Sequence, residues 1–254
     1  MLVSSRRKLT RVKLLRLLDE LEAAPGTAVS LYIPPGMPVS GIEKALDIAL
    51  GVEEVLPDVT RVVDRSVTGA VLFWGERGKY LVLPPFPIVD KLFSSGYDAE
   101  PLRSLLRREL MTALILLRLG AYAVGVFRGQ KLLSSKVGTG HIHSRHKKGG
   151  SSQRRFERGR EKQIEYFFER VCTRVRERLE PYINQLDYIV YGGERYTLLS
   201  FRKQCEFLRA VDDRTLGTTV NVREPKQATL EGAIDEVWSS EIIQWQEDQA
   251  RASQ

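Results

Sequence analysis

The sequence has too few cysteines and too short apolar runs for several classes of protein. It contains only two cysteines in 254 residues, Cys172 and Cys205, which do not support a disulfide scaffold. We therefore expect a reducing cytoplasm as its compartment, and a packing role for each cysteine in its own helix. The best candidate for a membrane segment, Met111 to Leu117, is far shorter than the roughly 18 residues of a span. No apolar stretch with a cleavage site follows Met1, so we expect neither secretion nor membrane insertion.

Several sequence signatures of enzymes are also missing. There is no Walker A phosphate loop, no Gly-x-Gly-x-x-Gly dinucleotide fingerprint and no His-Glu-x-x-His zinc motif. We interpret the adjacent carboxylates Asp212 and Asp213 as a cap or turn feature. The sequence therefore gives no reason to expect a cofactor or a structural metal ion.

The charge of the chain is concentrated in one segment. Lysine and arginine exceed aspartate and glutamate by seven over the whole sequence. The segment from His141 to Lys162 alone contains eight cations and two carboxylates, a net charge of +6. A concentrated basic segment is typical of a protein that binds an anionic partner, of which nucleic acid is the commonest.

Local patterns predict helices alternating with strands, which favours α/β layering. Helices are predicted over Leu9 to Ala24, Ile42 to Leu56, Glu100 to Leu119, Arg154 to Glu180, Thr197 to Leu208 and Leu230 to Glu247. Strands are predicted over Val29 to Ile33, Val67 to Trp74, Tyr80 to Leu83, Ala121 to Phe127, Lys131 to Val137, Tyr188 to Tyr191 and Leu216 to Val222. Pro84-Pro85-Phe86-Pro87 cannot continue a strand ladder, so we expect a linker there and two domains, 1–90 and 91–254.

The segment Gly149-Gly150-Ser151-Ser152-Gln153 is the most distinctive part of the sequence. It has no bulky side chain before Gln153, so its backbone can approach a ligand closely. Basic residues flank it on both sides: Arg145, His146, Lys147 and Lys148 before it, and Arg154, Arg155 and Arg158 after it. One interpretation is a flexible hinge in which Ser151 or Ser152 caps the following helix. The other is a phosphate-binding helix N-terminus, and contiguous charge in loop and helix favours contact with RNA.

All three histidines lie just before this segment, at His141, His143 and His146. A His-x-His pair on an extended chain can share a metal ion. Here the neighbouring cations repel such an ion and no carboxylate or cysteine completes the ligand set, so we expect polar loop residues instead.

The run Lys147 to Lys162, KKGGSSQRRFERGREK, resembles a family of known proteins. It is similar to the central-domain loop and helix of eukaryotic and archaeal class 1 peptide-chain release factors, which carry Gly-Gly-Gln followed by Arg-Phe-x-Arg. Gly149 and Gly150 match the two glycines, and Arg155, Phe156 and Arg158 match the second motif. Ser151 stands where those factors have glutamine, and Gln153 follows two positions later. This Gly-x-x-Gln arrangement resembles the Vms-like release factors, which are peptidyl-tRNA hydrolases.

The resemblance implies a fold, an activity and a set of site residues. The implied fold is α/β, or α+β overall: a ribonuclease-H-like mixed-sheet domain over 91–254, preceded by a smaller, shortened α/β domain over 1–90. The implied activity is a peptidyl-tRNA hydrolase that rescues stalled ribosomes, with Gln153 positioning water and Gly149, Gly150, Ser151 and Ser152 forming the rest of the catalytic loop. The absence of an Asn-Ile-Lys-Ser stop-codon motif makes it codon-independent. The implied partners of a monomer are the large ribosomal subunit and peptidyl-tRNA.

Two other functions remain as alternatives at this point. The first is a non-catalytic factor of release-factor ancestry that binds ribosomes or RNA, to which Gln153 would bring no advantage. The second is a nuclease, because the release-factor central domain resembles ribonuclease H in architecture. A nuclease of that type needs convergent carboxylates that bind Mg²⁺, and none is identifiable near the basic loop.

Overall fold

The computed structural model describes residues 2–23, 26–50, 56–143 and 153–246. Contacts between Cα atoms divide the chain into two units. The first unit comprises Met1–Arg108 together with Trp238–Gln254, and the second comprises Glu109–Val237. Among the described residues, no helix has both the length and the apolar character that crossing a membrane requires.

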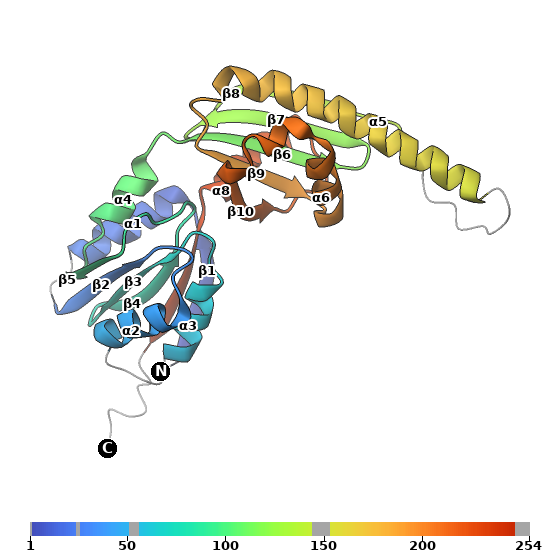
Figure 1. Cartoon of the computed structure of the whole chain (residues 1–254). Coiled ribbons are helices and arrows are strands. Elements are labelled where there is room, and N and C mark those ends of the chain that lie inside the picture. Colours follow the sequence, from blue (N-terminus) through green and yellow to red (C-terminus); the bar gives the residue numbers. More distant parts are fainter. Residues whose placement is uncertain (1, 24–25, 51–55, 144–152, 247–254) are drawn as a thin grey trace. The chain divides into compact units, whose positions relative to one another are not determined.

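The first unit contains a six-stranded antiparallel sheet in the order β1-β11-β4-β3-β2-β5 (Figure 1). Its strands are β1 (Leu2–Leu9), β2 (Ala28–Ile33), β3 (Ala70–Gly75), β4 (Gly78–Leu83), β5 (Leu92–Ser95) and β11 (Ser240–Gln246). Its helices are α1 (Arg11–Glu22), α2 (Val39–Leu50), α3 (Leu56–Asp64) and α4 (Glu100–Arg107). The apolar faces of α2 and α3 cover one face of the sheet, around Leu31, Leu72 and Trp74. The core of this unit is therefore a sheet with helices packed upon it, as the expected α/β layering requires.

The division differs from the expected boundary at residue 90 because the chain returns to the first unit at its end. The strand β11 pairs with β1 on one side and with β4 on the other. A helix was predicted over Leu230 to Glu247; the structure has α8 (Gln227–Val237) and then β11. The first unit is also about as large as the second, not smaller as expected.

The second unit contains a five-stranded mixed sheet in the order β10-β9-β6-β7-β8. Its strands are β6 (Met111–Arg118), β7 (Ala121–Arg128), β8 (Lys131–Thr139), β9 (Tyr188–Gly193) and β10 (Thr215–Val220). The first three strands are antiparallel, whereas β9 runs parallel to β6 and β10 parallel to β9. This order confirms the mixed sheet that the resemblance to release factors implied.

Helices cover both faces of the second sheet. They are α5 (Gln153–Leu179), α6 (Arg195–Gln204) and α7 (Glu206–Arg209), together with α8. The buried side of α5 presents Phe167, Phe168, Val171, Val175 and Leu179 to the sheet. In Figure 1 the later part of α5 lies along the sheet, and its first part, in yellow, extends beyond the strands. The start of α5 is therefore held out from the core of this unit.

The two cysteines form a disulfide, with their Cα atoms 5.4 Å apart. Cys172 lies in α5, and Cys205 lies at the junction of α6 and α7. The prediction of two separate packing cysteines is therefore wrong. The pairing is invisible in the sequence because it depends on how α5 and α6 pack in space, 33 residues apart along the chain.

Candidate functional site

The predicted catalytic loop lies almost wholly outside the described residues. Residues 144–152, nine in a row, are not described. They include these predicted site residues: Arg145, His146, Lys147, Lys148, Gly149, Gly150, Ser151 and Ser152. The structure places Gln153 as the first residue of α5 and Arg154 as the second. The catalytic and RNA-binding roles of these residues remain predictions.

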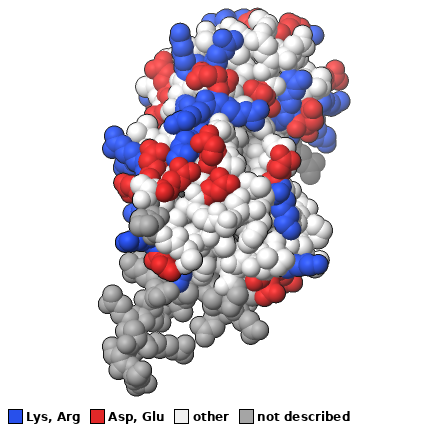
Figure 2. Space-filling view, turned by 90° about the vertical axis from the view of Figure 1, so that its left-hand side faces the viewer, with Lys and Arg blue, Asp and Glu red and all other residues white. Residues whose placement is uncertain are grey.

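The predicted cations that the structure does describe lie on the exposed start of α5. Arg155 and Arg158 are both exposed, and neither forms an ion pair with any described residue. By contrast, Lys/Arg and Asp/Glu side chains are interspersed on the face of the molecule seen in Figure 2. Unpaired cations on an exposed helix are available to an anionic partner such as RNA.

The segment that leads into the loop, residues 139–143, is fastened to α5 by three hydrogen bonds. The backbone N–H of His143 donates to Gln163 Oε1 at 3.0 Å, and Arg160 Nε donates to the carbonyl of His143 at 3.0 Å. Arg170 Nη2 donates to the carbonyl of Thr139 at 2.5 Å. The residue before the loop and the residue after it are therefore both tied to the same helix.

Gly140 allows this segment to lie close against α5. A Cβ atom at Gly140 would lie 2.6 Å from Phe167 Cδ2 and 2.7 Å from Arg170 Nη2. Its N–H also donates to the carbonyl of Gly120 at 2.8 Å, which holds the segment beside the start of β7. We call the 139–143 segment, with Arg160, Gln163 and Arg170, the loop root.

The loop root rests on a well-buried part of the second unit. Phe167 is 2% exposed, and its ring lies under the Arg170 guanidinium at 5.9 Å. Ile142 packs against the same apolar core from the segment side. The last described residues before the predicted catalytic loop thus rest on the core of the second unit.

Two arginines in the later part of α5 form ion pairs. Arg174 Nη1 donates to both carboxylate oxygens of Glu177 at 2.8 Å, and these bonds hold the pKa of Glu177 below its ordinary value. Arg176 pairs with Glu180 at 3.4 Å. Arg174 and Arg176 are thus engaged with carboxylates, whereas Arg155 and Arg158 near the start of α5 form no ion pair with a described residue.

The structure brings together two of the histidines that suggested a metal ion. The rings of His141 and His143 meet edge to face, with centroids 4.8 Å apart. Across residues 2–246, leaving out the undescribed gaps, no three His, Cys, Asp or Glu side chains are grouped closely enough to hold a metal.

Sequence reasoning missed several residues of this region. Arg160 and Gln163 were not among the predicted site residues, because their contacts are with a segment about 20 residues earlier. Phe156, named as part of the Arg-Phe-x-Arg match, is an aromatic side chain that is 61% exposed. Tyr166 was not selected at all and is 70% exposed. Its position one residue before the buried Phe167 is the signal that could have identified an aromatic residue on the outer face.

The sequence is similar to known release factors. The sequence model described as "Actinobacteria/chloroflexi VLRF1 release factor" matches residues 111–243, just over half of the chain. Peptide chain release factor subunit 1 of Aeropyrum pernix is 29% identical over 211 residues, which cover 70% of this chain and 56% of that protein. The same factor of Archaeoglobus fulgidus is 26% identical and covers 73% of this chain and 53% of its own length. The chain thus spans about half the length of the curated relatives it matches.

Solved structures of release-factor-like proteins also match, at lower sequence identity. An archaeal translation termination factor, aRF1, aligns over 91% of this chain and 73% of its own, with a TM-score of 0.39 and 20% identity. A structure titled "Vms1 mitochondrial localization core" aligns over 78% and 84% of the two chains, with a TM-score of 0.42 and 11% identity.

The sequence model, which matches more than half of the chain, defines a protein of the release-factor class. Within this class, the chain belongs to the actinobacterial and chloroflexi VLRF1 release factor family.

Proposed function

We propose that this protein is a codon-independent peptidyl-tRNA hydrolase that frees nascent chains from stalled ribosomes or separated large subunits. It acts in the cytoplasm as a monomer, on the large ribosomal subunit, with peptidyl-tRNA as its substrate. The bond it hydrolyses is the ester between the peptide and the terminal ribose of tRNA. Family membership supports an action on the ribosome.

Gln153 is the proposed catalytic residue. A side-chain amide is no general base near neutral pH, but it offers both a donor and an acceptor and can orient a water molecule. Orientation of a reactant contributes several kcal/mol, within the roughly 7–11 kcal/mol of ideal alignment. A backbone N–H beside Gln153 is the proposed donor to the oxyanion that develops during attack.

The rest of the loop supplies access and anchoring. Gly149, Gly150, Ser151 and Ser152 leave little side-chain bulk before Gln153, which suits entry into a narrow cavity lined by RNA. The flanking cations bind phosphates of rRNA or tRNA, and this contribution is strongly dependent on salt. These cations are Arg145, His146 (when protonated), Lys147, Lys148, Arg154, Arg155 and Arg158.

The observation that carries this proposal is the position of Gln153 relative to the loop root. Gln153 begins α5, and the same helix binds residues 139–143 through Arg160, Gln163 and Arg170. A catalytic group that begins a rigid helix loses little orientational freedom when the substrate binds.

A peptide-release assay tests the proposal. Stalled ribosomal complexes and separated large subunits carrying labelled peptidyl-tRNA are incubated with the wild type, Gln153→Ala or Gln130→Ala. Gln130 is an exposed glutamine in the β7–β8 turn and serves as the matched control. We expect Gln153→Ala to slow release by roughly 10²- to 10³-fold, as the loss of one preorganised polar group does elsewhere. Gln130→Ala should release at the wild-type rate.

Two results would contradict the proposal in different ways. Equal release by the wild type and Gln153→Ala would remove Gln153 from the mechanism. Binding to the complexes without release by any variant would establish the non-catalytic, ribosome-binding alternative.

A further inference from the structure

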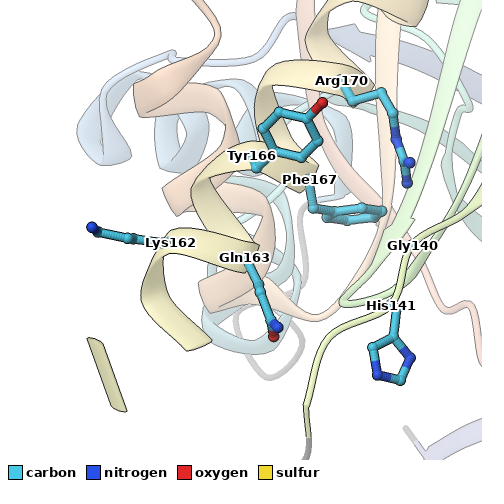
Figure 3. A pocket seen from close by; sticks show the side chains of 7 residues that line it. All are labelled: Gly140, His141, Lys162, Gln163, Tyr166, Phe167 and Arg170. Atoms are coloured by element: carbon cyan, nitrogen blue, oxygen red, sulfur yellow. The ribbon is translucent and has the colours of Figure 1, made fainter. Parts of the chain in front are cut away.

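A cavity lies beside the loop root, between α5 and the segment that follows β8. Its volume is about 480 Å³, within the range of roughly 300–1,000 Å³ that is usual for small-molecule sites. Gly140 and His141 line one side, and α5 residues between Lys162 and Arg170 line the other. Figure 3 shows His141 and Gln163 on opposite sides of this space, and the Phe167 ring beside Arg170. The cavity thus lies beside the last described residues before the proposed catalytic loop.

The walls of this cavity are fixed before any ligand arrives. The close packing of Gly140 on Phe167 and Arg170 leaves no room for a side chain at that position. Gln163 holds the backbone of His143, and Arg170 holds that of Thr139. A preformed site of this kind requires little ordering when it binds a ligand.

The chemistry of the lining suits a nucleotide. Two aromatic rings belong to it, Tyr166 and Phe167, and Tyr166 is 70% exposed although it neighbours a core residue. Lys162 and Arg170 supply positive charge, and no carboxylate belongs to the lining. Lys162 points outward in Figure 3, where a phosphate outside the cavity would lie. Stacking on an aromatic face together with a cation for the phosphate is the usual means of binding single-stranded RNA.

We propose that this cavity binds one nucleotide of single-stranded RNA, with its base stacked on Tyr166 and its phosphate contacted by Lys162. The inference rests on the proposed function, which surrounds the loop root with ribosomal RNA and tRNA. A nucleotide held here fixes the loop root on RNA and so sets the direction from which the loop reaches the peptidyl ester. Tyr166 is then a positioning residue, not a catalytic one.

Binding of fluorescein-labelled hexauridylate and hexaadenylate to the full chain, measured by fluorescence anisotropy at low salt, tests this site directly. Tyr166→Ala should weaken binding by roughly 5- to 150-fold, the range for the loss of one base stack. Tyr166→Phe keeps the ring and should restore most of the affinity. The control is Tyr196→Ala, because Tyr196 is an equally exposed tyrosine, at 77%, on α6 of the same unit. Lys162→Ala should lower the slope of log affinity against log salt by roughly 0.7, the contribution of one phosphate contact.

Three results would overturn the site: equal affinity of the wild type and Tyr166→Ala, an equal loss in Tyr196→Ala, or displacement of both oligonucleotides by a glutamate hexapeptide at comparable concentration. The last would show an unspecific anion-binding surface. In the release assay, Tyr166→Ala should raise KM with little change in kcat, whereas Gln153→Ala should lower kcat. If Gln153→Ala releases peptide as the wild type does while RNA binding still depends on Tyr166, the hydrolase proposal fails and the nucleotide site stands.

Discussion

The two halves of α5 both carry many charged residues, but they lie in opposite surroundings. In the later half, Phe167, Phe168, Val171, Val175 and Leu179 are buried in the core of the second unit. Arg174 is paired there with Glu177 of the same helix, and Arg176 with Glu180, the residue that follows it. In the earlier half, Arg155, Phe156, Arg158, Lys162 and Tyr166 are exposed.

This difference shows how one helix can serve both stability and function. The buried half fixes the axis of α5 on the sheet, and the hydrogen-bonded backbone carries that direction into the exposed half. The exposed half can then present cations and aromatic rings without contributing to the core. Substitutions in the two halves should therefore separate effects on stability from effects on RNA.

Two phenylalanines twelve residues apart give the largest expected contrast. Phe168 is 3% exposed and packs on Phe201 with ring centroids 5.7 Å apart, whereas Phe156 is 61% exposed. Phe168→Ala should lower the free energy of unfolding by roughly 3–5 kcal/mol, through lost burial and a cavity. Phe156→Ala should change it by no more than about 0.5 kcal/mol. Urea denaturation of both variants measures the contrast, and similar losses would show that the earlier half is also part of the core.

The disulfide gives the next largest effect, and it concerns only the later half of α5. Cys172 and Cys205 close a loop of the chain with a separation of 33 residues. In the chain-entropy description, reduction of such a cross-link costs roughly 3–4 kcal/mol of unfolding free energy. Unfolding of the oxidised protein with and without a reductant measures this loss, and the Cys172→Ser/Cys205→Ser variant should not respond to the reductant. Two reactive thiols in the unfolded, unreduced protein would contradict the pairing.

Alanine substitutions at two glycines compare how tightly the loop root and the exposed half of α5 are packed. A methyl group at Gly140 would overlap Phe167 and Arg170, so Gly140→Ala should cost roughly 1–3 kcal/mol through overpacking. Gly159 lies in α5 with no neighbour within 4 Å of the added carbon. Gly159→Ala should therefore stabilise the protein by up to about 1 kcal/mol, through helix propensity. Thermal unfolding of both variants measures these changes in stability, which should have opposite signs. An unchanged stability of Gly140→Ala would show that the loop root is not tightly packed.

The smallest effect should appear only in the salt dependence of RNA binding. Arg155→Ala/Arg158→Ala removes two exposed cations that form no ion pair with a described residue, and it should lower the slope of log affinity against log salt by roughly 1.4. Arg174→Ala/Arg176→Ala removes two paired cations from the later half and should leave the slope unchanged. The measurement is the affinity for hexauridylate at several salt concentrations between roughly 50 and 200 mM, a range over which such affinities change measurably. Equal slopes for the two double variants would show that position along α5 does not matter.

Much of the second unit could be predicted from local sequence. The long helix was expected over Arg154 to Glu180 and lies over Gln153–Leu179, because its apolar residues recur at helical spacing and Pro181 follows it. The strands β7 and β8 were also predicted, on either side of a turn that contains Gly129. By contrast, β6 was predicted as the end of a helix over Glu100 to Leu119. It is buried on both faces in the middle of the sheet, so its side chains show no alternation between polar and apolar.

The sequence by itself determined the basic segment, the side-chain-poor approach to Gln153 and the helix that begins there, because these depend on neighbours along the chain. Only the tertiary structure decided that β11 completes the first sheet, that Cys172 meets Cys205, and that residues 139–143 bind α5 beside a cavity. Each of these pairings joins segments distant along the chain. Their energies come from packing and hydrogen bonds in space, which local periodicity does not record.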